Sequence, residues 1–164
     1  MSTRWQLPAD YVRSQAGAAL GARLRRLSDR IDREADALYQ ALNVDFEQRW
    51  FGFVNQLMLH KTRTVGEIAE ALGVTHVAVS QVRSALAERG LIVAEVDSAD
   101  SRRRVLKLSA AGKRLALKLA STWAALNDAA RELDAEANCV VSALEQLEDA
   151  LDRRSLTNRV QSRL

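Results

Sequence analysis

The chain has 164 residues, a hydrophobic fraction of 48% and a formal net charge of +3 at pH 7. This length supports one independent apolar core and argues against two large domains. A composition with one proline and seven glycines is typical of a helix-rich soluble protein and excludes fibrous or disordered classes. The 24 basic and 21 acidic residues are too evenly balanced to identify a partner, so the position of the charges must do so.

No stretch approaches the roughly 18 consecutive apolar residues of a membrane span, and the amino terminus lacks the apolar run of a secretory signal. Cys139 is the single cysteine, so it forms no intrachain disulfide, and its neighbours supply no zinc motif. We therefore expect a cytoplasmic protein without metal or cofactor. Because Cys139 has no basic neighbour to stabilise a thiolate, we expect an inert, buried thiol.

Residues 8–42 predict one long helix that begins near Pro8, since proline suits a first helical turn. Interleaved arginines and carboxylates indicate an ion-paired, solvated surface on its other faces, and a phosphate-binding track is the alternative. The apolar stripe is too long for one short neighbour, so it packs on helices elsewhere in the chain or on another subunit, with dimerisation as the natural outlet. Its residues are Leu20, Leu24, Leu27, Ile31, Leu38 and Leu42.

The middle of the chain predicts a helix over residues 46–59 that presents Trp50, Phe53, Val54 and Leu57 to the core. Thr64 and Glu67 have the spacing of a capping box, which predicts a short helix over residues 65–72. Gly73 then allows a positive φ, and Thr75 is a suitable cap for a second helix over residues 76–89 that Gly90 ends.

Two helices joined by so short a turn cross steeply and form a helix-turn-helix. Ala69, Gly73 and Val79 fill the crossing, and the miniature core comprises Ile68, Leu72, Val74, Val82 and Leu86. The outer face of the second helix carries His76, Val77, Ala78, Ser80, Gln81 and Ser84. Such a short-chained face fits a major groove, where the Gln81 amide can pair with adenine. The alternative is an ordinary helical hairpin of an all-α protein.

Residues 91–96 and 104–108 read as two strands of a β-hairpin around the polar loop 97–103. Arg102, Arg103 and Arg104 form a basic tip that can reach phosphates or the minor groove, and Asp100 can brace Arg102. A solvated loop is the alternative for an arginine run, but its position after a groove-reading helix favours contact with DNA.

From Ser109 onward the pattern is again helical, with Ser109 as a cap and one apolar face comprising Leu115, Leu119, Trp123, Leu126 and Leu133. A second segment has the spacing of a packed helical seam, with Val140, Leu144, Leu147 and Leu151. This seam either faces the core of one subunit or contacts a second subunit.

Residues 42–112 resemble the MarR family of bacterial winged helix-turn-helix regulators. The segment VGEIAEALGVTHVAVSQVRSALAERGLI is similar to the family's helix pair, and DSADSRRRVLKLSAAG to its wing and the start of the next helix. Asp100 and Arg102 match the Asp-x-Arg motif of the wing, and Leu108, Ser109 and Gly112 match the junction that follows it.

The resemblance implies a mainly α fold with a small β-hairpin wing. It divides the chain into an N-terminal dimerisation helix (1–42), a winged helix-turn-helix domain (43–108) and C-terminal dimerisation helices (109–164). It implies a homodimer that binds a palindromic double-stranded DNA operator, most commonly as a repressor. The implied recognition-helix residues are Thr75, His76, Val77, Ala78, Ser80, Gln81, Arg83 and Ser84, and the implied wing residues are Asp100, Arg102, Arg103 and Arg104.

Three positions depart from the family. Gln81 stands where many members have arginine, Arg83 where an apolar residue is common, and Val77 where serine is frequent. We therefore expect a base preference of this chain's own, with Arg83 on a phosphate. The resemblance also implies a small aromatic or lipophilic effector in a pocket between the dimer helices and the winged domain, with Trp50, Phe53, His60 and Trp123 as candidate lining residues. The alternative for aromatic residues at helical spacing is an ordinary place in the core.

Two other classes of protein are weaker interpretations. An enzyme is disfavoured because the chain has two histidines and no phosphate loop, nucleophile elbow or telling carboxylate pair. A winged-helix module that binds proteins and not DNA is the alternative function, and the arginine wing argues against it.

Overall fold

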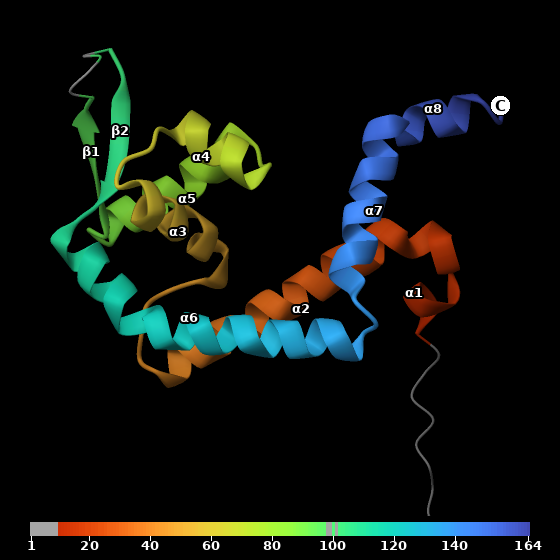
Figure 1. Cartoon of the computed structure of the whole chain (residues 1–164), viewed down its shortest axis with the longest axis horizontal. Helices are drawn as coiled ribbons and strands as arrows, with labels where there is room; N and C mark the ends of the chain where they lie inside the picture. The colour runs from red at the N-terminus through yellow and green to blue at the C-terminus, as the bar shows by residue number, and fades with distance from the viewer. Residues whose placement is uncertain (1–9, 98–99, 101) are drawn as a thin grey trace, which may run out of the picture. The chain divides into compact units, whose positions relative to one another are not determined.

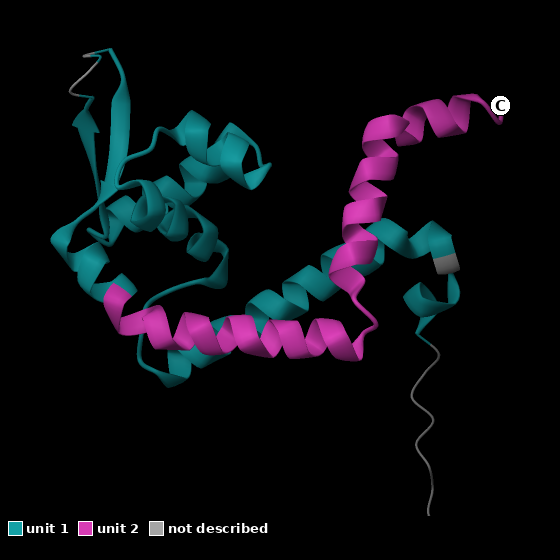
Figure 2. Cartoon of the chain, viewed as in Figure 1, with its two compact units in different colours: residues 1–116 teal, residues 117–164 magenta. Residues whose placement is uncertain are grey.

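A computed structural model describes residues 10–97, 100 and 102–164 (Figure 1). The chain forms two compact units, residues 1–116 and 117–164 (Figure 2). The boundary between them falls inside α6 (Ala110–Glu136). The division by function at residues 42/43 and 108/109 stays a prediction, because compactness does not test it.

The N-terminal segment is not one helix. It comprises α1 (Tyr11–Ser14), the 3-10 turn η1 (Ala16–Ala19) and α2 (Leu20–Ala41). The carboxylate of Asp10 accepts a hydrogen bond from the Arg13 amide at 3.2 Å and binds the Arg26 guanidinium at 2.9 Å. In one straight helix, residues 10 and 26 would lie about 24 Å apart. The single helix predicted from Pro8 is therefore wrong, although Pro8 itself lies outside the described residues.

The second predicted helix also starts later than expected, because side chains of α2 hold the segment before it. The Gln48 amide donates to Asp36 Oδ1 at 2.6 Å, and the Tyr39 hydroxyl donates to Gln48 Oε1 at 2.7 Å. Glu47 is consequently extended, and η2 (Gln48–Trp50) leads into α3 (Phe51–His60). The predicted core residues of this helix, Trp50, Phe53, Val54 and Leu57, are buried.

The helix-turn-helix is confirmed almost residue for residue. It consists of α4 (Val65–Leu72) and α5 (His76–Glu88), with Gly73 left-handed at φ 63° between them. The Thr75 hydroxyl accepts a hydrogen bond from the Ala78 amide at 3.2 Å and caps α5. Ile68, Ala69, Val79 and Leu86 are buried in the crossing, as predicted. Gly73, predicted to fill the crossing, is exposed and an added Cβ would meet nothing within 4 Å, so this glycine serves the turn and not the packing.

The wing is an antiparallel hairpin of β1 (Ile92–Val96) and β2 (Arg104–Leu108), in which Ile92 pairs with Leu108 and Val96 with Arg104. Ile92, Leu106 and Leu108 are buried on one face, and Glu95 and Lys107 form an ion pair on the other. The helical content and the two-stranded wing confirm the predicted fold class.

The second unit contains the rest of α6, then α7 (Val140–Arg153) and α8 (Leu156–Gln161). Asn138 and Cys139 are both left-handed and make the turn before α7. Because this turn lies at the surface, Cys139 is exposed, and the predicted buried thiol is wrong.

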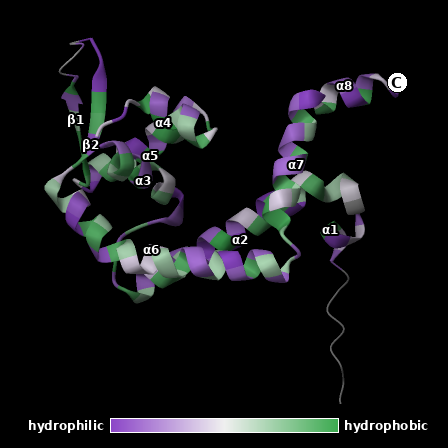
Figure 3. Ribbon diagram, viewed as in Figure 1, coloured by the Kyte–Doolittle hydropathy of each residue, from purple (hydrophilic) through white to green (hydrophobic). Residues whose placement is uncertain are grey.

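Hydrophobic and hydrophilic residues alternate along α2 and α7 (Figure 3). None of the described helices is long and apolar enough to cross a bilayer.

Hydrogen bonds of Ser109 hold the start of α6 against the segment that ends α5. The Ser109 amide donates to the Leu91 carbonyl at 3.0 Å, and its hydroxyl donates to the Gly90 carbonyl at 2.6 Å and accepts from the Gly112 amide at 3.0 Å. A Cβ at Gly112 would lie 2.0 Å from the Leu91 carbonyl oxygen. Glycine is therefore required at this position by contact with backbone.

We expect Gly112→Ala to lower the free energy of unfolding by about 1–3 kcal/mol, because the backbone must move to make room for the methyl group. Gly21→Ala is the matched control: its Cβ would meet only Arg25 Nη1, at 3.8 Å, and alanine is the better helix former by up to about 1 kcal/mol. Urea unfolding measures both, and equal stability of the two variants would contradict this account of the junction.

Candidate nucleic-acid interface

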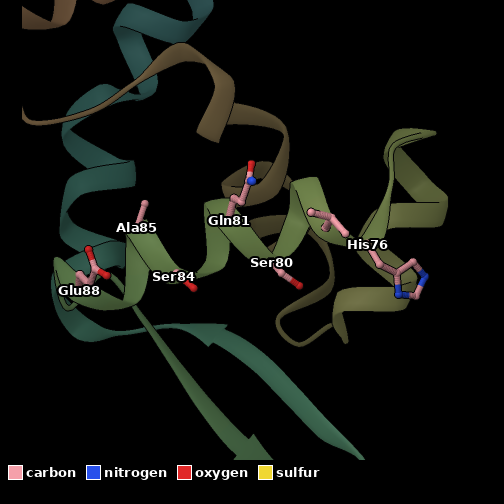
Figure 4. Close-up of a pocket in the computed structure, with 7 residues that line it drawn as sticks. His76, Ser80, Gln81, Ser84, Ala85 and Glu88 are labelled. Carbon is pink, nitrogen blue, oxygen red and sulfur yellow. The ribbon is translucent and has the colours of Figure 1, made fainter.

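The outer face of α5 is open and lies opposite its core anchors. Val79 and Leu86 are buried, whereas the opposite face lines a shallow hollow (Figure 4) with His76, Val77, Ser80, Gln81, Ser84, Ala85 and Glu88. Figure 4 shows His76, Ser80 and Ser84 following one another along one side of the helix. Spacings of four residues produce this row, and the short serine side chains keep the helix surface low enough for close approach of a partner.

The predicted recognition residues do not all lie on the same surface of α5. His76, Val77, Ser80, Gln81 and Ser84 share the outer hollow. Three others do not line it: Thr75 caps α5, Ala78 lines a different hollow beside α3, and Arg83 is exposed on the helix. Base contact by Ala78 thus loses support, and the exposed Arg83 stays available for a phosphate.

Two residues of the outer face were missed. Ala85 and Glu88 line the same hollow as Ser84, and extending the spacing of four residues from Gln81 and Ser84 would have found both. Glu88 is the one acidic side chain among the residues that line this hollow. Its carboxylate can accept a hydrogen bond from a cytosine amino group but repels a phosphate.

In the wing, the Asp100 carboxylate binds the backbone amide of Arg102 and not its guanidinium. Its Oδ1 accepts a hydrogen bond from the Arg102 amide at 2.9 Å. Arg102 and Arg104 are exposed, and no ion pair of either is found among the described residues. Arg103 is different, because its guanidinium contacts Glu67 Oε1 of α4 at 2.9 Å and approaches Asp97 Oδ2 at 3.8 Å.

Glu67 connects the wing to the helix pair. Its Oε2 accepts hydrogen bonds from the Thr64 amide at 2.7 Å and the Thr64 hydroxyl at 3.0 Å, which completes the predicted capping box. These backbone and hydroxyl bonds, together with the Arg103 guanidinium, hold the pKa of Glu67 below its ordinary value. The Thr64-x-x-Glu67 pattern predicted the cap but not the second partner, which lies 36 residues further along the chain.

A second contact joins the wing to the residue that precedes the α4 cap. The Arg63 amide donates to the Leu106 carbonyl at 3.1 Å, and the Leu106 amide donates to the Arg63 carbonyl at 2.8 Å. This bridge adds one residue to the edge of the hairpin. A single bridged residue has no alternation pattern, so the sequence did not predict this contact.

Arg89 anchors the other end of α5. Its Nε donates to Asp45 Oδ2 at 2.8 Å, and its guanidinium lies 4.6 Å from the centroid of the Trp50 ring. This combination of an ion pair and a cation–π contact ties the C-cap of α5 to the segment before α3. Arg89 is therefore occupied within the protein.

The predicted effector residues are only partly brought together. Trp50 and Phe53 line an apolar hollow of about 290 Å³ between α3 and α5, and Trp50 Nε1 is buried without a hydrogen-bond partner among the described residues. His60 is exposed at the end of α3, outside this hollow, and Trp123 belongs to the second unit. Leu72 and Val74, predicted as core, are 36% and 44% exposed because they form the rim of the hollow.

A capped helix pair followed by a twisted hairpin with an exposed basic tip defines a winged helix-turn-helix domain. The comparisons with known proteins agree. The family model described as MarR family matches residues 44–103. No curated protein matches the sequence of this chain.

Several solved structures share the fold over most of the chain. The MepR–DNA complex of S. aureus is 22% identical, covers 80% of this chain and 97% of that chain, and has a TM-score of 0.68. The MarR/EmrR family transcriptional regulator from Acinetobacter sp. ADP1 is 19% identical, with coverages of 82% and 95% and a TM-score of 0.67. The PcaV transcriptional regulator from Streptomyces coelicolor, in complex with its natural ligand, is 19% identical, with coverages of 84% and 94% and a TM-score of 0.63.

At these identities the solved structures show the fold, and the family model identifies the winged segment. Residues 44–103 of this chain match the MarR family model, and the solved structures share its winged helix-turn-helix fold. The predicted resemblance is confirmed, and it supports the expectation of a regulator and not an enzyme.

The capping carboxylate predicts a pH dependence of stability. Because the folded pKa of Glu67 is below its ordinary value of 4.5, its contribution to the free energy of unfolding is complete above that pH and is lost as the pH falls through the folded pKa. Glutamine at this position keeps the capping box without the charge. We expect the difference in melting temperature between wild type and Glu67→Gln to be larger at pH 7 than at pH 3. A constant difference would contradict the assignment.

Proposed function

We propose that this protein is a sequence-specific transcriptional repressor that binds a palindromic double-stranded DNA operator as a homodimer and is released by a small effector. The observation that carries the proposal is the open, short-chained outer face of α5 beside the exposed Arg102 and Arg104 of the wing. A helix of this kind enters the major groove, and guanidinium groups beside it reach phosphates or the minor groove. The S. aureus MepR structure is a complex with DNA.

Exposed apolar surface supports dimerisation. The six residues of the N-terminal apolar stripe, five in α2 and Leu42 at its C-cap, are between 37% and 49% exposed in the single chain. No residue of α7 is buried, and Val140, Val141 and Leu151 are exposed. A second copy is the natural cover for both surfaces, since large apolar patches on a lone subunit mark interaction sites. Two-fold symmetry of the protein then implies an inverted repeat in the DNA, with half-sites about 10 bp apart or a multiple of that distance.

The hollow lined by Trp50 and Phe53 supports release by an effector. It is mostly apolar and is lined by the aromatic residues Trp50 and Phe53, as in sites that bind a lipophilic ligand. The PcaV structure contains a natural ligand. The Gln81 side chain lines both this hollow and the outer face, so a ligand there would affect a base-reading residue. A cytoplasmic location follows from the proposed target.

Salt dependence tests the proposal against the alternative of a protein-binding module. We expect affinity for a duplex recovered from a randomised pool to fall steeply between 50 and 200 mM salt, because counterions are released on binding. Arg102→Ala should weaken binding roughly tenfold or more and reduce the slope of log K against log salt by about 0.9. Unchanged affinity in this variant would remove the wing from the interface. A salt-independent contact would favour the protein-binding module.

Base readout is tested by Gln81→Ala. We expect this variant to lose discrimination at one position in each half-site by about 1–3 kcal/mol, while total affinity for unrelated duplexes stays the same. Selection from a randomised duplex pool, with wild type in parallel, measures the preference at every position. Ala87→Ser, a substitution on the same helix but outside the hollow, is the control. Identical selected motifs for wild type and Gln81→Ala would contradict the recognition face.

A further inference from the structure

The three arginines of the wing tip do not share one role. The Arg103 guanidinium contacts Glu67 at 2.9 Å and lies 3.8 Å from Asp97. Asp97 is on the same hairpin, and its amide donates to the Arg103 carbonyl at 2.9 Å. Arg103 thus joins both sides of the hairpin to the first turn of α4, whereas Arg102 and Arg104 have no ion pair among the described residues.

The carboxylate that receives Arg103 is already fixed in place. Glu67 Oε2 accepts from the Thr64 amide and hydroxyl, which leaves Oε1 for the guanidinium. The acceptor is therefore a preorganised part of α4 and not a mobile surface side chain. An ion pair made by a fixed partner loses less side-chain entropy and orients the group that it holds.

A second, independent contact between the wing and the helix pair allows the Arg103–Glu67 pair to fix the orientation of the wing. The backbone of Arg63 is bonded to Leu106 of β2 in both senses. Leu106 and Arg103 are three residues apart along the chain, about 10 Å in an extended strand. One contact would leave the wing free to turn about that point, whereas two contacts, one on Arg63 just before the α4 cap and one on Glu67 in the first turn of α4, fix its angle.

We propose that the Arg103–Glu67 ion pair is the contact that sets the angle of the wing against the helix pair, so that Arg102 and Arg104 are the DNA-contacting cations and Arg103 is a positioning residue. The role assigned to Arg103 by the family resemblance is thereby revised. Neutralising the middle member also reduces repulsion within the run of three arginines. The DNA part of this inference rests on the proposed function, but the angle of the wing does not.

Whether Glu67→Gln strengthens or weakens DNA binding distinguishes a positioning role of Arg103 from direct contact with DNA. If Arg103 contacted a phosphate, Glu67 would compete with DNA for it, and Glu67→Gln would strengthen binding. If the pair positions the wing, Glu67→Gln and Arg103→Gln both weaken binding, by about three- to tenfold, and the double variant is no weaker than either single one. Arg103→Gln then leaves the salt slope of wild type unchanged, whereas loss of a phosphate contact lowers it by about 0.9.

Two control variants match the changes in charge, and a third variant keeps the charge of Arg103. Glu70→Gln removes a carboxylate from the same helix, where no ion pair of Glu70 is found among the described residues, and we expect unchanged or slightly tighter binding. Arg104→Gln should lower both affinity and salt slope. Arg103→Lys keeps the charge and should restore part of the affinity. Stronger binding by Glu67→Gln, or a reduced salt slope for Arg103→Gln, would overturn the positioning role.

Hydrogen exchange in the free protein tests the same pair without DNA. We expect the amides of Asp97 and Arg103 to exchange faster in Glu67→Gln and Arg103→Gln, while amides in α5 keep their wild-type rates. Unchanged exchange in the wing would overturn the inference even if both variants bound DNA weakly. Faster exchange in a protein that binds no duplex would instead leave the wing contact standing and refute the proposed function.

Discussion

The backbone carbonyl of Leu91 lies where three elements of the winged domain meet. It follows the left-handed Gly90 that ends α5, it directly precedes β1, and it accepts the hydrogen bond of the Ser109 amide that leads into α6. Gly112 approaches so closely that a methyl group would overlap the carbonyl oxygen. The end of α5, the root of the wing and the start of α6 are therefore fixed by one tight backbone contact.

The arginines of the winged domain fall into two groups: some are paired within the protein, and others are exposed. Arg89 is engaged by Asp45 and Trp50, and Arg103 by Glu67. Exposed pairs of this kind contribute little to stability individually, but each one connects elements that are distant in sequence. These ion pairs therefore matter more for the relative placement of the elements than for the free energy of unfolding. The exposed arginines of the wing keep their charge for a partner, which is the distribution expected of a surface that binds a polyanion.

Local signals in the sequence predicted the winged domain well. The Thr64–Glu67 capping box, the left-handed Gly73 and the Thr75 cap act over three or four residues, so their geometry is encoded where they occur. The broken N-terminal helix was mispredicted because Asp10 reaches Arg26, a contact that no periodicity reveals. The second partner of Glu67 was missed for the same reason, since it depends on how the hairpin packs and not on neighbouring residues.

The outer face of α5 shares no side chain with the buried set of that helix: Val77, Ser80, Gln81 and Ser84 line the hollow, whereas Val79 and Leu86 form the core. Mutations on this face therefore carry little thermodynamic penalty, since surface substitutions away from packed or bonded groups change stability by less than about 0.5 kcal/mol. Selection can exchange these side chains one at a time without first acquiring compensating changes elsewhere. The side chains of this surface can therefore change while the stability of the fold is conserved.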